Sequence, residues 1–141
     1  MKKILFFSVI VLLVALSACG SKQKILSPTE VFISHYEAEI RRDLVTLEGN
    51  LSKDSLKAIK ETSIKQNLDE SYLIENSLGI SKTGFPEVVS EKIEDRTAVI
   101  KIKNPLSGRL DEMPFVKEDG RWKIDLYKFI NDSLKQLNKK D

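Results

Sequence analysis

The spacing of apolar residues divides the chain into an apolar start, a helical half and a strand-rich half. Ile4 to Leu16 is apolar at every position except Ser8. From about residue 27 to residue 78, apolar residues recur at three- and four-residue intervals, which is typical of amphipathic helices. From residue 87 to residue 126 they alternate with polar residues, which is typical of strands with one buried face. The pattern predicts helices followed by a sheet.

The first helix is predicted by a strong start signal. In Ser27-Pro28-Thr29-Glu30, the serine is an N-cap, the proline fits the first turn, and the glutamate completes a capping box. Phe32, Tyr36 and Ile40 follow at four-residue intervals and form one apolar stripe. We expect this helix to run from about Pro28 to Arg42.

Three further helical segments are expected before the sheet. Asp43 caps a short helix, Leu44 to Glu48, and Ser52 caps a longer one, Lys53 to about Asn67. Asp69 to Leu78 adds another helical turn or two. The inner side of the longer helix comprises Leu56, Ala58, Ile59 and Ile64.

Strand signals follow in the second half. The predicted strands are Glu87 to Glu94, Thr97 to Lys103, and Leu110 to Glu118. Pro114 lies inside the third strand and lacks a backbone N–H, so it indicates an edge or a bulge there.

A hairpin and a closing helix complete the pattern. Asp119-Gly120 is the strongest hairpin signal, because this pair tolerates the positive φ of a tight turn. Beyond it, Trp122, Ile124 and Leu126 alternate with polar residues, so one face of that strand is buried. The last predicted element is an amphipathic helix from Tyr127 to Asn138, with an apolar side formed by Ile130, Leu134 and Leu137.

The order of these elements predicts an α+β fold. N-terminal helices followed by an antiparallel meander pack with the helices on one face of the sheet. Of the 141 residues, 27–141 are expected to form a single domain. Residues 1–18 then form a signal peptide that is removed, and residues 19–26 form a short tether.

The start of the chain has the three parts of a secretory signal. Lys2 and Lys3 are basic, the apolar run is thirteen residues long, and small residues follow it. A run of that length is too short to span a hydrocarbon layer of about 30 Å comfortably. The segment is therefore interpreted as an export signal.

The end of that signal resembles the lipobox of bacterial lipoproteins. Leu16-Ser17-Ala18-Cys19 fits the pattern Leu-(Ala/Ser)-(Gly/Ala)-Cys at every position. The resemblance implies cleavage after Ala18, diacylglycerol on the Cys19 thiol, and acylation of the new amino group. It implies the outer membrane in a cell with two membranes, and otherwise the outer face of the cell membrane. The alternatives are an ordinary secretory signal with a chance cysteine, or a single-pass anchor that is never cut.

Removal of the predicted signal changes the net charge of the chain. The whole chain has 23 basic and 21 acidic residues and a formal charge of +2, whereas without Lys2 and Lys3 it is neutral. That balance argues against a nucleic-acid partner, which requires a basic stripe. One cysteine and one histidine exclude an internal disulfide, a multi-thiolate zinc site and a two-histidine metal site. We expect no metal and no cofactor.

A family resemblance covers about Ser27 to Leu126. Glu94-Asp95-Arg96-Thr97-Ala98-Val99-Ile100 and the hairpin from Phe115 to Ile124 are similar to small bacterial lipoproteins of unknown function with a nuclear-transport-factor-2-like domain. The resemblance implies a cystatin-like roll, in which helices pack on a curved antiparallel sheet. The helix after Tyr127 departs from many members, and it could close the mouth of the roll.

Four residues are the candidates for a ligand pocket in such a roll: Phe32, His35, Tyr36 and Trp122. His35 is placed either at a pocket rim, as a base or hydrogen-bond donor, or at a half-exposed boundary with a carboxylate or water as its partner. Trp122 is either a ligand platform or, as is usual in such a hairpin, a core anchor.

The sequence favours a non-enzymatic function. A steroid-isomerase-like site needs an inward Asp base, and none is identifiable; Asp125 alternates outward. The sequence also lacks a Gly-x-Ser-x-Gly elbow, and a triad would have to recruit His35. We therefore expect an envelope lipoprotein that is held on a membrane through Cys19 and docks another envelope protein. The alternative is a small-molecule binding protein that uses the concave face of the roll.

Overall fold

The computed structural model describes residues 24–79 and 84–137. The predicted signal peptide and Cys19 lie outside these residues, as do the side chains of Leu134 and Leu137 in the predicted closing helix.

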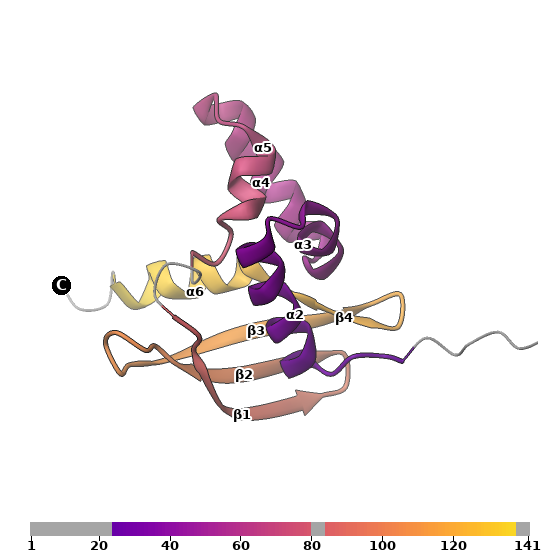
Figure 1. Ribbon diagram of the computed structural model, residues 1–141, viewed down its shortest axis with the longest axis vertical. Helices are drawn as coiled ribbons and strands as arrows, with labels where there is room; N and C mark the ends of the chain where they lie inside the picture. The colour runs from indigo at the N-terminus through magenta and orange to yellow at the C-terminus, as the bar shows by residue number, and fades with distance from the viewer. Residues whose placement is uncertain (1–23, 80–83, 138–141) are drawn as a thin grey trace, which may run out of the picture.

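The fold is α+β, as the sequence predicts (Figure 1). The sheet is antiparallel, its strand order is β1-β2-β3-β4, and it is open, because β1 and β4 do not pair with each other. α2 lies across one face of this sheet, and α3, α4 and α5 lie beyond it on the same side. The elements are α2 (Pro28–Arg41), α3 (Leu44–Asn50), α4 (Lys53–Gln66), α5 (Glu70–Glu75), β1 (Glu87–Glu94), β2 (Thr97–Lys103), β3 (Leu110–Glu118), β4 (Arg121–Ile124) and α6 (Leu126–Leu137).

The predicted cap of α2 is confirmed. The Glu30 N–H donates to Ser27 Oγ at 3.2 Å, and the Ser27 N–H donates to Glu30 Oε2 at 2.9 Å. These two bonds satisfy backbone donors that have no partner within the helix. Asp43, Ser52 and Asp69 cap α3, α4 and α5, each through a side-chain oxygen that accepts one backbone N–H of the first turn.

Removing the α2 cap has a measurable cost. Ser27→Ala leaves a helix donor without its acceptor, so we expect the free energy of unfolding to fall by about 1 kcal/mol. Urea denaturation measures this change. Ser27→Gly is the control, because glycine at an N-cap costs only a few tenths of a kcal/mol. Equal losses in the two variants would contradict the role of the serine hydroxyl.

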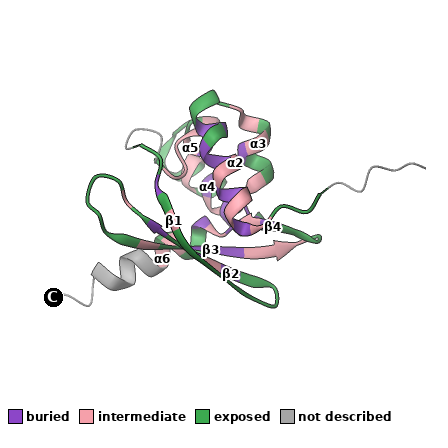
Figure 2. Cartoon of the chain, turned by 60° about the horizontal axis from the view of Figure 1, so that its bottom comes forward, coloured by how far each residue is buried: buried purple, intermediate pink, exposed green. Residues whose placement is uncertain are grey.

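Buried residues gather between the helices and the sheet (Figure 2). The core consists of apolar residues from α2–α6, β2–β4 and the segment between α3 and α4: Val31, Phe32, Ala38, Leu47, Leu51, Ile59, Ile74, Ala98, Ile100, Ile102, Met113, Phe115, Trp122, Ile124 and Leu126. Two predicted core positions are wrong. Ile40 is 57% exposed, because the buried side of α2 continues through Ala38 and Glu39 instead. Ile64 is 75% exposed and lies beyond Ile59, the last buried residue of α4.

The prediction that Pro114 marks an edge strand or a bulge in β3 is also wrong. β3 is a central strand, and the bulge lies in β1 between Val88 and Ser90. Proline is tolerated in β3 because its backbone faces the end of β4, where the Asp125 N–H donates to the Pro114 carbonyl at 2.9 Å. The last β3–β4 pair is Phe115 with Ile124, so no residue of β4 lies opposite Pro114 to accept a hydrogen bond from its missing N–H.

The outer edge of β4 is partly covered by the chain between α3 and α4. Leu51 forms a parallel bridge with Ile124, and the Ser52 N–H donates to the Ile124 carbonyl at 3.0 Å. Ser55 Oγ donates to the same carbonyl at 3.3 Å. β1, at the other side of the sheet, is exposed along nearly its whole length.

Candidate functional site

The structure places the four predicted pocket residues in the interior. Phe32 and His35 have 0% exposure, Trp122 has 6% and Tyr36 has 8%. α2 supplies Phe32, His35 and Tyr36, and β4 supplies Trp122. Phe32 and Trp122 belong to the same core cluster, so Trp122 is the core residue that its hairpin predicts.

His35 is neither at a rim nor half-exposed, which corrects both predicted positions. Its Nε2 lies 2.9 Å from Ser77 Oγ, in the segment after α5, and 3.9 Å from Glu39 Oε1. Glu39 Oε1 also accepts a hydrogen bond from the Leu78 N–H at 2.9 Å. The buried polar cluster therefore joins α2 to residues 77–78.

The tautomer of His35 follows from its partners. Nδ1 is buried and has no hydrogen-bond partner among the described residues. An imidazole N–H without a partner is more costly in the interior than a bare lone pair, so we place the proton on Nε2, which donates to Ser77 Oγ. Burial lowers the pKa of His35 from 6.5 to about 4, and the ring is neutral at pH 7.

This cluster is not a catalytic triad. In a triad the histidine accepts a proton from the serine on one ring nitrogen, and a carboxylate binds the other nitrogen. Here Ser77 and Glu39 both lie on the Nε2 side. With the proton on Nε2, His35 acts as a donor to Ser77 and not as its base. The arrangement holds α2 against the α5–β1 connection.

Sequence reasoning missed both partners of His35. Glu39 lies one helical turn after His35, and that four-residue spacing was a signal that could have found it. Ser77 is 42 residues away along the chain, so only the fold brings it close. Tyr36 packs against the same connection, since its ring meets that of Phe85 edge-on at 4.8 Å between centroids.

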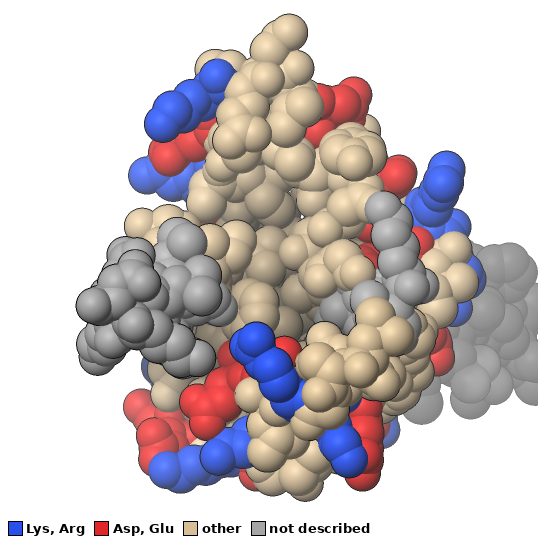
Figure 3. Space-filling view, turned by 90° about the vertical axis from the view of Figure 1, so that its left-hand side faces the viewer, with Lys and Arg blue, Asp and Glu red and all other residues tan. Residues whose placement is uncertain are grey.

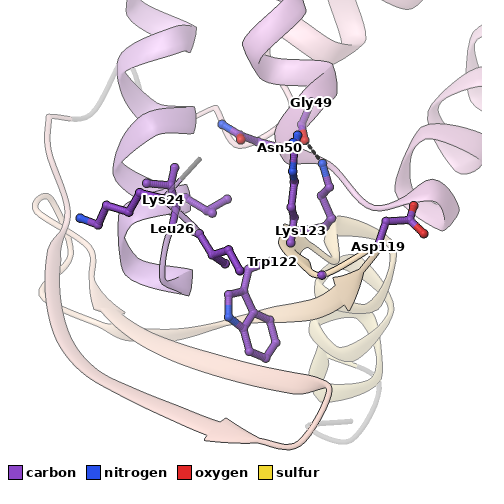
Figure 4. Close-up of a pocket in the computed structure, with 11 residues that line it drawn as sticks. Lys24, Leu26, Gly49, Asn50, Asp119, Trp122 and Lys123 are labelled. Carbon is purple, nitrogen blue, oxygen red and sulfur yellow. Dashed lines mark hydrogen bonds between the residues drawn. The ribbon is translucent and has the colours of Figure 1, made fainter. Parts of the chain in front are cut away.

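An open groove of about 360 Å³ lies at the other end of α2 (Figure 4). The residues before α2 form one wall of the groove, and the β3–β4 hairpin forms the other. The side chain of Trp122, on β4, extends from the hairpin toward the first wall. Of the four predicted pocket residues, only Trp122 lines this groove. Its lining is Lys24, Ile25, Leu26, Val31, Gly49, Asn50, Asp119, Gly120, Arg121, Trp122 and Lys123.

Most of the charges around the groove have partners within the protein. Lys24 Nζ lies 2.6 Å from Glu30 Oε1, and Lys123 Nζ donates to the Gly49 carbonyl. Lys53 Nζ contacts Asp119 Oδ2 at 3.1 Å, just outside the groove. The Lys24 hydrogen bond is the main reason that the pKa of Glu30 lies below its ordinary value. The groove has an apolar floor and a rim of mixed charge.

The described part of the chain offers neither a metal site nor a membrane-spanning helix. No group of three or more His, Cys, Asp or Glu residues is placed there to hold a metal ion. None of the helices in residues 24–79 and 84–137 has the length and apolarity that a membrane crossing requires.

Comparison with known proteins does not assign the chain to a family. No model of a known protein family matches the chain, and no curated protein is significantly similar to it in sequence. The resemblance to nuclear-transport-factor-2-like lipoproteins stays a prediction, and so does the lipobox.

Proposed function

We propose that this protein is a membrane-anchored envelope lipoprotein whose domain is a non-enzymatic interaction module. The observation that carries the proposal is Leu16-Ser17-Ala18-Cys19, which lies at the end of a signal-like segment. The α2 cap at Ser27 supports it, because a structured domain begins eight residues after the cysteine. The lipid supplies the location, and the domain supplies the contact surface.

We also propose that the domain is a cystatin-like roll. The contacts that α2 makes with β1, β2 and β4 support this arrangement, because they place one helix across the width of an antiparallel sheet. The burial of Phe32 and His35 favours the interaction module over the small-molecule alternative, because a ligand needs open space beside the residues that bind it.

The lipid attachment is tested by replacing Cys19 with alanine in the full chain. Cells are grown with an alkyne-tagged fatty acid, and the protein is examined for the tag and for its membrane fraction. We expect the wild type to carry the tag and to sediment with membranes, whereas Cys19→Ala should carry no tag. An acyl chain contributes about 0.8 kcal/mol per buried CH₂, so the loss of all chains removes the anchor.

Ser21→Ala is the matched control for this experiment. It lies two residues after Cys19 and leaves the lipobox unchanged, so it should carry as much tag as the wild type. A wild-type chain without the tag, or a Cys19→Ala chain with it, would show that the lipoprotein proposal is wrong.

A further inference from the structure

Two of the three turns between neighbouring strands, β1–β2 and β3–β4, lie at one end of the molecule with the segment before α2. The β1–β2 turn at Asp95-Arg96 and the β3–β4 turn at Asp119-Gly120 are joined, since the Lys117 N–H donates to the Arg96 carbonyl at 2.8 Å. Residues 24–26 line the groove beside the second turn, and the chain leaves the domain in that direction (Figure 1). We call residues 24–26, 95–96 and 119–121 the hairpin end.

The β2–β3 turn marks the opposite end. Residues 104–109 connect these two strands at the end of the sheet that is farthest from both hairpin turns. Figure 3 views the molecule from that side and shows a hollow in uncharged surface near its centre, with charged side chains below it.

The predicted anchor lies close to the hairpin end along the chain. Five peptide units connect Cys19 to Lys24, and they reach at most about 18 Å even when fully extended. A lipid on Cys19 therefore keeps the hairpin end within that distance of the membrane surface. The opposite end has no such constraint.

Exposed apolar residues at the hairpin end suit contact with a bilayer. Ile25 is 61% exposed and Leu26 is 37% exposed, and they directly follow Lys24. Apolar side chains beside a lysine are the combination that enters the boundary between lipid headgroups and acyl chains. Arg121 is exposed on the other wall of the groove, and with Asp95 and Asp119 exposed at the same end the charge there is mixed, so the apolar residues carry the contact.

We propose that the hairpin end lies on the phospholipid headgroups, so that the β2–β3 turn and the hollow beside it face away from the membrane. This proposal rests on the proposed lipid anchor, and it adds an orientation that the anchor alone does not fix. It assigns Lys24, Ile25, Leu26 and Arg121 to the lipid-facing surface, and it leaves the opposite end for a partner protein.

Fluorescence quenching by lipids tests this orientation. The full lipidated chain is prepared with one added cysteine, Arg121→Cys or Leu106→Cys, labelled with a fluorophore and reconstituted in phosphatidylethanolamine–phosphatidylglycerol vesicles. Some of the lipids carry a nitroxide on the headgroup. Position 121 lies at the hairpin end, whereas Leu106 is 75% exposed at the opposite end and serves as the matched control. We expect several-fold stronger quenching at position 121.

The outcomes separate the two proposals. If the chain binds the vesicles but both positions are quenched equally, or Leu106→Cys more strongly, the orientation is wrong and the lipid anchor stands. If the chain does not bind the vesicles at all, both proposals are wrong. Stronger quenching at position 121 that persists at high salt supports contact through the tether and its apolar residues.

Discussion

Phe32→Ala is expected to lower the free energy of unfolding by about 3 to 5 kcal/mol. The ring has 0% exposure and lies in the cluster that joins α2 to the sheet, so its removal leaves a cavity between them. Because the stability of an ordinary domain is only about 5 to 15 kcal/mol, a loss of this size brings the protein close to unfolding. Chemical denaturation at pH 7 measures the change.

Ile40→Ala is the control on the same helix. Ile40 is 57% exposed, so its truncation is expected to change the free energy of unfolding by less than about 1 kcal/mol. The comparison isolates burial, because both substitutions create an alanine within α2. If Ile40→Ala lowered the free energy of unfolding as much as Phe32→Ala, the assignment of Phe32 to the packed face of α2 and of Ile40 to its exposed side would be wrong.

Acidification is expected to destabilise the protein through His35. The unfolded chain binds a proton on this histidine below pH 6.5, whereas the folded protein binds it only below about pH 4. Between these values the unfolded state holds more protons, so stability is complete above pH 6.5 and is lost as the pH falls toward 4. The difference of about two and a half pKa units corresponds to a loss of about 3 kcal/mol.

His35→Gln shows how much of that loss belongs to the histidine. Glutamine donates a hydrogen bond to Ser77 but does not titrate, so the variant should lose about 3 kcal/mol less between pH 7 and pH 4. Carboxylates with lowered pKa, such as Asp43, contribute equally to both proteins. Equal pH dependence in both proteins would mean that Glu39, 3.9 Å from Nε2, holds the protonated ring as an ion pair.

Local signals predicted most of the fold because each acts within a few residues. Ser27, Asp43 and Ser52 cap their helices through side chains that reach only the next turn. Asp119 and Gly120 form the expected tight turn, with φ values of 49° and 77°. Such signals need no information about the rest of the molecule.

The candidate site could not be predicted to the same extent, because it depends on long-range packing. The apolar stripe of α2 predicts a buried Ile40 and not a buried Glu39, because a carboxylate is buried only when a partner is present. That partner, the Leu78 N–H, is 39 residues away. The groove likewise combines the segment before α2 with a hairpin about 95 residues later, which no local pattern connects.

The cover on β4 limits how copies of this protein can associate through their sheets. An added strand requires a free row of backbone N–H and C=O groups. Leu51 and Ser52 occupy part of that row on β4, which is only four residues long, whereas β1 pairs only with β2 among the described strands and is exposed along nearly all of its eight residues. Each molecule then offers a single free edge. Two copies can pair through their β1 edges, and the pair leaves no free edge to which a third copy could add. That restriction favours discrete dimers over filaments.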